Sequence, residues 1–122
     1  MKHQICIIED TRDLLENLTS FLRLEGFDVL PCKSGEEALE IFKDRVPALI
    51  ITDLWMPGMD GFVLISEIRK NKRLTEVPLA VYSAAQLTDM EKDFLKDKIS
   101  GYIKKPISMD GMLECINGFL KK

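Results

Sequence analysis

The stretch ALIIT at residues 48–52 is the most apolar run of the chain, and it decides the fold. It lacks the alternation of polar and apolar residues that a strand with one solvent-exposed face requires. A strand of this composition is buried on both faces, so we expect it at the centre of a parallel sheet. Asp53 follows directly, which places a carboxylate at the carboxyl end of this central strand.

Short apolar runs alternate with amphipathic stretches on both sides of residues 48–52, at a spacing of about 20–25 residues that is typical of βα units. Five units do not make an eight-unit barrel, so they predict a doubly wound (βα)5 sandwich, an α/β fold with a parallel five-stranded sheet. Right-handed crossovers favour the strand order 2-1-3-4-5 in a single domain of residues 1–122. The strands are expected at 4–8, 27–30, 48–52, 79–83 and 101–104, and the helices at 13–25, from Ser34 onward, 62–70, 86–96 and 109–120.

Apolar residues three or four positions apart in an expected helix lie on one face, which we expect to pack against the sheet. We see no linker and no low-complexity segment between these elements. The expected buried residues are Leu14, Leu18 and Leu22 in helix 13–25, Leu87, Met90 and Phe94 in helix 86–96, and Met112, Leu113, Ile116 and Leu120 in helix 109–120.

The composition limits the class of protein. With 122 residues, of which 46% are hydrophobic and 30% charged, the chain can bury a core and cover it with a polar surface. Its net charge of -3 gives no general attraction to nucleic acid. No apolar run approaches the roughly 18 residues of a membrane span, and three cysteines without a CxxC motif indicate reduced thiols. We expect a cytoplasmic protein that binds neither nucleic acid nor membrane directly.

Charged residues follow three of the expected strands. Glu9 and Asp10 come after 4–8, Asp53 after 48–52 and Lys105 after 101–104. In an open parallel sheet, ligands bind in the crevice at the carboxyl ends of the strands. Adjacent carboxylates repel unless a cation lies between them, and magnesium prefers oxygen ligands. Glu9 and Asp10 alone fit a solvated helix N-terminus better than a metal site, but Asp53 across the crevice favours the metal site.

Asp53 can act as a nucleophile that forms an acyl phosphate, and this attack needs a cation to balance the charge of the phosphoryl group. Lys105 can supply that cation, and Lys104 competes for the role. Strand alternation places the two lysines on opposite faces. Pro106 favours Lys105, since a proline fixes the direction of the residue before it. Ser83 ends the strand 79–83, where its hydroxyl either donates to a phosphoryl oxygen or caps the following turn.

Four motifs occur in chain order: IIED at 7–10, ITDLWMPGMDG at 51–61, VYSA at 81–84 and GYIKKP at 101–106. Over essentially the whole chain, the sequence resembles a response-regulator receiver domain, the family of the bacterial chemotaxis regulator. The resemblance implies a flavodoxin-like fold and a role in two-component signal transduction or a phosphorelay. It implies that a sensor histidine kinase, or a histidine phosphotransfer protein, donates a phosphoryl group to Asp53, and that the chain catalyses this step and its own slow dephosphorylation.

The resemblance also implies a metal site. Glu9, Asp10 and Asp53, with the backbone carbonyl of Trp55, are expected to surround Mg²⁺, with Mn²⁺ as an alternative. Glu9 stands where aspartate is common in the family, and its longer side chain can reach the ion through a water. This departure changes rates rather than the class of chemistry.

Further residues match the family's signalling and loop positions. Ser83 and Tyr102 match a switch pair, and Lys105 matches the lysine that pairs with the phosphate. The surface of the fourth helix, fifth strand and fifth helix is then expected to engage a downstream protein, with a phosphorylation-dependent homodimer as another expected outcome. Trp55 and Ala85 are expected to tune the dephosphorylation rate, because their apolar side chains crowd the path of an attacking water. Gly61 and Pro106 are expected to be structural.

Three other interpretations are weighed. A phosphatase of the haloacid-dehalogenase type needs a second acid two residues after the nucleophile, where this chain has Trp55. A flavin-binding module needs a phosphate loop rich in glycine and hydroxyl groups, where this chain has Glu9 and Asp10. A pseudo-receiver, a protein-interaction module that is never phosphorylated, normally lacks one of the acids or the lysine, and none is missing here.

Overall fold

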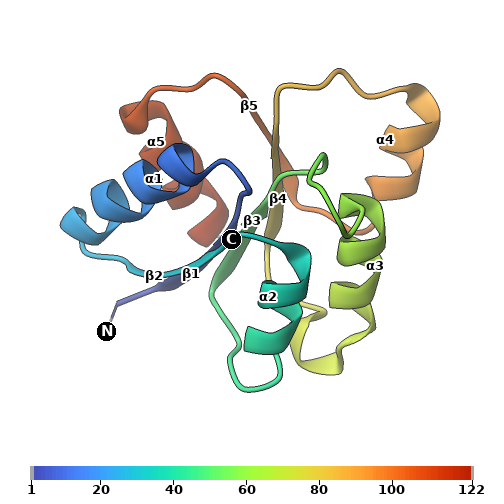
Figure 1. The fold of residues 1–122 in the computed structure, drawn as a ribbon, viewed down its shortest axis with the longest axis horizontal. Helices are drawn as coiled ribbons and strands as arrows, with labels where there is room; N and C mark the ends of the chain where they lie inside the picture. The colour runs from blue at the N-terminus through green and yellow to red at the C-terminus, as the bar shows by residue number, and fades with distance from the viewer. Residues whose placement is uncertain (1, 122) are drawn as a thin grey trace.

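The computed structural model describes residues 2–121. Five parallel strands form one sheet in the order β2-β1-β3-β4-β5, which confirms the predicted α/β fold and strand order (Figure 1). The central strand β3 lies between β1 and β4, as its apolar sequence predicts. The strands are β1 Gln4–Ile8, β2 Asp28–Cys32, β3 Leu49–Thr52, β4 Leu79–Ser83 and β5 Gly101–Lys104.

Helices cover both faces of the sheet. Figure 1 shows α1 and α5 together on one side and α2, α3 and α4 on the other. No helix in the described part of the chain has the length and apolar composition needed to cross a membrane. The helices are α1 Arg12–Leu24, α2 Gly35–Ile41, α3 Gly61–Lys70, the short 3-10 helix η1 Lys72–Leu74, α4 Asp89–Leu95 and α5 Met109–Leu120.

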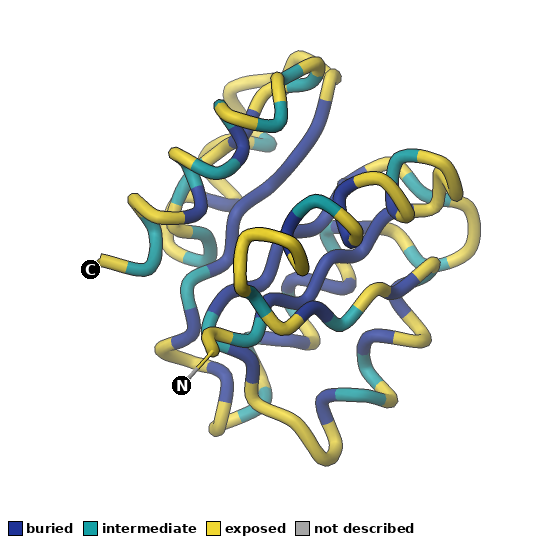
Figure 2. The backbone as a smooth tube through the Cα atoms, turned by 90° about the vertical axis from the view of Figure 1, so that its left-hand side faces the viewer, coloured by how far each residue is buried: buried dark blue, intermediate teal, exposed yellow. Residues whose placement is uncertain are grey.

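The core consists of two apolar layers separated by the sheet, whose buried strands run through the middle of Figure 2. All four residues of β3 are buried. Leu49 and Ile51 contribute to the layer under α1 and α5, whereas Ile50 contributes to the layer under α2, α3 and α4. The absence of polar alternation in β3 therefore reflects burial on both faces.

The boundaries of the predicted elements agree with the structure within one or two residues, except at the start of α4. Strand β2 continues through Pro31 to Cys32, where the prediction ended at residue 30. Helix α4 begins three residues later than predicted, because Thr88 and Glu91 form a reciprocal capping box that fixes its start. The short helix η1 was not predicted.

The predicted buried face of α4 is wrong. Met90 is 82% exposed and Phe94 is 42% exposed, whereas Leu95 is fully buried. The helix starts later than predicted, so Leu87 lies before it and is partly buried against the core. Among the described residues of α4, Leu95 is the one that is buried. In α1, Leu18 and Leu22 are buried as predicted, but Leu15 is buried in place of Leu14, which is only partly buried.

Arg69 holds three chain segments together through its guanidinium group, which the sequence prediction missed. Its Nη1 donates to the carbonyls of Leu74, at 2.7 Å, and Val77, at 2.8 Å, and its Nε donates to the carbonyl of Lys98 at 2.7 Å. Burial lowers the pKa of Arg69, and the charge of Glu76 opposes this effect. The guanidinium thus donates to backbone carbonyls of the segments that follow α3 and α4.

Cys6 and Cys32 lie on the neighbouring strands β1 and β2, with their sulfurs 3.8 Å apart. Both are free thiols, as is Cys115. The hydrogen bond to Cys32 and burial raise the pKa of the Cys6 thiol. These two side chains fill the core as small apolar groups.

Gly61, the first residue of α3, approaches the backbone of Leu54 closely. A Cβ atom at this position would lie 2.5 Å from the Leu54 Cα and 2.6 Å from its carbonyl oxygen. The Gly61 N–H also donates to that carbonyl at 3.1 Å. The loop that carries Asp53 is therefore fixed to the start of α3 by a contact that only glycine allows.

We predict that Gly61→Ala lowers the free energy of unfolding by about 1–3 kcal/mol, because backbone must move to admit the methyl group. Urea denaturation followed by circular dichroism measures the change. Gly118→Ala in α5 is the matched control, since a Cβ there meets nothing within 4 Å, and it should be neutral or stabilising. Equal stability of Gly61→Ala and the wild type would show that the loop accommodates a side chain.

Candidate functional site

The charged residues gather where β1, β3 and β5 end. Ile8 and Thr52 are paired in the sheet, so Glu9 and Asp53 leave their strands at the same level. The Asp53 N–H donates to the Ile8 carbonyl at 3.1 Å, and the Lys105 N–H donates to the Ser83 carbonyl at 3.1 Å. These bonds extend the sheet by one residue and fix the backbone from which each functional side chain starts.

The Asp53 carboxylate is nearly buried and is held by three donors. Its Oδ1 accepts the N–H groups of Leu54, at 2.7 Å, and Trp55, at 3.3 Å. Its Oδ2 accepts from the Lys105 ammonium at 2.8 Å. The two N–H donors come from the turn that follows β3, so the turn itself orients the carboxylate.

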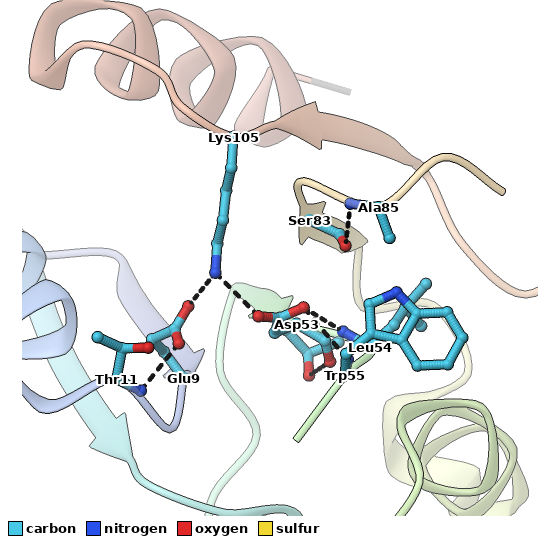
Figure 3. A network of polar contacts seen from close by, with 9 residues as sticks. Glu9, Thr11, Asp53, Leu54, Trp55, Ser83, Ala85 and Lys105 are labelled. Atoms are coloured by element: carbon cyan, nitrogen blue, oxygen red, sulfur yellow. Dashed lines mark hydrogen bonds and ion pairs between the residues drawn. The ribbon is translucent and has the colours of Figure 1, made fainter. Parts of the chain in front are cut away.

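Lys105 lies between two acids, as Figure 3 shows. Its Nζ donates to Glu9 Oε1 at 2.6 Å and to Asp53 Oδ2 at 2.8 Å. Burial lowers the pKa of Lys105, but the hydrogen bonds and charges of Asp53 and Glu9 outweigh it, and the pKa is raised overall. The ammonium therefore stays charged at neutral pH, where it balances the charge of the crevice.

The other Glu9 oxygen is also engaged. Glu9 is fully buried, and its Oε2 accepts the Thr11 N–H at 2.9 Å. Each oxygen of this buried carboxylate therefore has a partner, which offsets the cost of transferring the charge from water. Glu9 thus links β1, the start of α1 and the lysine that follows β5.

The structure brings Lys105, and not Lys104, into the crevice. Lys104 is exposed at the edge strand β5, as strand alternation indicates. The peptide bond between Lys105 and Pro106 is cis.

Three carboxylates could hold a metal ion. Glu9, Asp10 and Asp53 each place one oxygen so that all three lie within 4.8 Å of one another. A donor set made only of oxygens fits a hard divalent cation such as Mg²⁺ or Mn²⁺. Asp10 is exposed, and within residues 2–121 its carboxylate makes no hydrogen bond or ion pair, so it is the acid most available to an ion.

Within residues 2–121, the side chains of Ser83 and Tyr102 form no hydrogen bond with the charged cluster. The Ser83 hydroxyl accepts the Ala85 N–H at 3.1 Å, so it caps the turn after β4, as one of the two sequence interpretations has it. Tyr102 is 48% exposed on β5. A groove of about 350 Å³ separates them, and Leu87 and Lys92 also line it. The structure therefore leaves space between the two residues predicted to form the switch pair.

The Trp55 ring packs on an aromatic neighbour. Its centroid lies 5.6 Å from that of Phe62 in an edge-to-face arrangement, and Phe62 lies 5.9 Å from Phe94 in the same way. About half of the Trp55 side chain remains exposed. This aromatic row connects the loop after Asp53 to α3 and α4, which sequence analysis did not predict.

Tyr82 is the site residue that sequence reasoning missed. The Lys105 Nζ lies 4.8 Å from the centroid of its ring, and Tyr82 is only 3% exposed. Burial raises the pKa of the Tyr82 phenol, the Lys105 charge opposes this shift, and Glu9 and Asp53 add to it. Alternation along β4 predicts that Tyr82 and Ser83 lie on opposite faces, but it does not show that Tyr82 meets Lys105.

Comparisons with known proteins find relatives over nearly the whole chain. A family described as the response regulator receiver domain matches residues 5–117. A probable transcriptional regulator, ycf27, from Porphyridium aerugineum is 34% identical over 128 residues, which cover 99% of this chain and 49% of that protein. The chain thus spans about half the length of this relative. The polar-differentiation response regulator DivK from Brucella ovis is 24% identical over 120 residues, which cover 98% of both chains.

Solved structures show the same fold. The chemotaxis protein CheY4 from Vibrio cholerae superimposes with a TM-score of 0.91 at 21% identity, over 98% of this chain and 100% of that one. At this identity the likeness concerns the fold alone. The match to the receiver family, by contrast, covers most of the chain. The chain therefore belongs to the response-regulator receiver-domain family of two-component signal transduction.

Proposed function

We propose that this chain is a phosphoacceptor response regulator in which Asp53 receives a phosphoryl group. The donor is the phosphohistidine of a sensor histidine kinase or of a histidine phosphotransfer protein. The observation that supports this most directly is the Lys105 ammonium, which lies 2.8 Å from Asp53 Oδ2 and also pairs with Glu9, while an Asp10 oxygen lies within 4.8 Å of oxygens of both acids. One cation beside a nearly buried carboxylate, with oxygens for a second cation, suits the transfer of an anionic phosphoryl group.

In the proposed reaction, an Asp53 oxygen attacks phosphorus. The new oxygen–phosphorus bond forms as the bond from phosphorus to the donor nitrogen breaks, and the electron pair of that bond stays on the histidine. The N–H groups of Leu54 and Trp55 orient the carboxylate, and Lys105 balances the charge of the transferred group. A divalent cation held by Glu9, Asp10 and Asp53, with the Trp55 carbonyl, would offset the repulsion between the anions.

The chain is thus an enzyme only toward itself, because it catalyses its own phosphorylation and its own slow dephosphorylation. The aspartyl phosphate is the signal. Trp55, packed on Phe62, and Ala85 beside Ser83 are the residues that we propose to restrict water near phosphorus. Gly61 and Pro106 are proposed to hold the two loops that carry Asp53 and Lys105.

The output surface is proposed to be α4, β5 and α5. Phosphate on Asp53 would draw the Ser83 hydroxyl away from the Ala85 N–H, and Tyr102 could then enter the groove between them. This change would alter the surface that meets a downstream protein or a second copy of the chain. The alternative is a pseudo-receiver that acts only as a protein-interaction module, and the first experiment below separates the two.

We predict that acetyl phosphate with magnesium adds one phosphoryl group to the protein and that Asp53→Ala abolishes this addition. Intact-mass spectrometry detects the group, and hydroxylamine should remove it because acyl phosphates are labile to this reagent. Chelation of the metal should also prevent the addition. The matched control is Asp60→Asn, which changes a carboxylate in the same loop and keeps a residue that can cap α3. Addition that persists in Asp53→Ala would contradict the assignment.

We predict that Trp55→Asn shortens the lifetime of the phosphorylated protein, because a small polar side chain admits water that the indole ring excludes. Loss of the phosphoryl group is followed by intact mass after the donor is removed. Val63→Asn makes the same kind of change at another exposed apolar residue, on α3, and should leave the lifetime unaltered. A lifetime that stays the same or lengthens in Trp55→Asn would rule out the rate-tuning role.

We predict that beryllofluoride, a mimic of the phosphoryl group, changes amide hydrogen exchange in α4, β5 and α5 of the magnesium-loaded protein. The hydrogen bond from Ser83 to the charged group is of a kind that contributes about 1.5–3 kcal/mol, enough to shift a balanced equilibrium more than tenfold. Ser83→Ala should suppress the distant changes while retaining those next to Asp53. If exchange changes only in the loops around Asp53 in the wild type, the proposed output surface is wrong.

A further inference from the structure

Among residues 2–121, the Lys105 ammonium forms ion pairs with two acids and a cation–ring contact with a third, uncharged side chain. Glu9 and Asp53 are acids that the proposed function also assigns to the metal ion, and Asp53 in addition receives the phosphoryl group. The third neighbour is the face of the Tyr82 ring, 4.8 Å from Nζ at the ring centroid. A cation this close to an aromatic face is attracted by the negative potential of the ring, and more strongly when water is excluded.

The three contacts differ in what happens to them as the site fills. A divalent cation would compete with Lys105 for the oxygens of Glu9 and Asp53. The ring face is neither a ligand for a hard cation nor a nucleophile, so it is the one contact that the reaction leaves to Lys105. Without it, a lysine that loses its two carboxylates would turn toward solvent, where ammonium groups are strongly hydrated.

The surroundings make Tyr82 a rigid support. It is 3% exposed and belongs to the apolar layer under α1 and α5, and it pairs with Ile103 across β4 and β5. An attraction to a ring face does not depend on a single donor–acceptor direction. The ammonium can therefore tilt from the carboxylates toward phosphoryl oxygens while it stays over the ring.

We propose that Tyr82 is a positioning residue that keeps the Lys105 ammonium in the crevice when a metal ion occupies the carboxylates. The proposal rests on the proposed function of Asp53 and Lys105. It gives a role to Tyr82, which lies in the VYSA motif but had none from the sequence. It attributes the effect to the electrons of the ring rather than to the hydroxyl group. Tyr82→Phe should therefore behave like the wild type, and Tyr82→Leu should not.

The first experiment measures the rate of phosphorylation by acetyl phosphate at saturating magnesium. Tyr82→Phe should stay within about twofold of the wild type, and Tyr82→Leu should be about 5- to 30-fold slower, the range expected for loss of a desolvated cation–ring attraction. Because leucine could also disturb the core, phenylalanine with increasing numbers of ring fluorines is introduced at position 82. Fluorination withdraws electron density from the ring face with little change of shape, so the rate should fall step by step.

The second experiment observes Lys105 directly by NMR, without any reaction. Protons on the carbon next to Nζ lie in the ring current of Tyr82 and should resonate upfield, both before and after magnesium is added. The shift should persist in Tyr82→Phe and vanish in Tyr82→Leu, and Lys105→Met assigns the signal. Lys104→Met is the matched control, and it should leave the signal in place.

The outcomes separate this inference from the proposed function. If the wild type takes up no phosphoryl group at Asp53, the proposed function fails, and the NMR shift in the magnesium-loaded protein still decides whether Tyr82 retains the lysine. If the wild type is phosphorylated but its rate is insensitive to Tyr82→Leu and to ring fluorination, the positioning role is overturned. Loss of the upfield shift when magnesium binds would also overturn it.

Discussion

The structure depends on one ammonium group that is shared by two buried or nearly buried carboxylates. Lys105 reaches both Glu9 and Asp53, and so connects the ends of β1, β3 and β5. Neither acid could be buried as an ion without a partner, because desolvation would cost more than the fold can offset. With Asp10 included, the cluster holds three carboxylates and one ammonium, which leaves an excess of two negative charges. A divalent cation has the charge that balances this excess.

Parallel strands make this convergence a consequence of topology. All five strands end at the same edge, and the double burial of β3 places Asp53 at the middle of that edge. The contact of Gly61 with Leu54 holds the following loop close to the sheet, so the N–H groups of Leu54 and Trp55 reach Asp53. The apolar core and the polar site therefore share one constraint, which is the position of the end of β3.

This relation explains what the sequence could predict. Burial on both faces marks β3, and strand-end position then brings Asp53, Glu9 and Lys105 together. The sheet and the charged cluster therefore follow from periodicity, the right-handed crossover rule and the position of Pro106. The α4 face was mispredicted because a local capping box, from Thr88 to Glu91, outweighs the apolar spacing that includes Met90 and Phe94. Contacts between elements, such as that of Tyr82 with Lys105, depend on packing angles and side-chain rotamers that no periodicity encodes. The same holds for the carbonyls that Arg69 binds.

Strand β4 places Tyr82 and Ser83 on opposite faces, and we propose a different role for each. Tyr82 faces Lys105 within the apolar layer of α1 and α5, whereas Ser83 lines the groove that also borders Tyr102. The first residue is fixed by close packing, which resists displacement because interiors contain few voids. The second is held by a single hydrogen bond to Ala85 beside open space, so it can move at low cost. A phosphoryl group on Asp53 would thus meet a lysine held in place on one side and a movable hydroxyl on the other. Under the proposed function, this difference in mobility directs the structural change toward the groove beside α4 and β5. The buried layer under α1 and α5 stays unchanged.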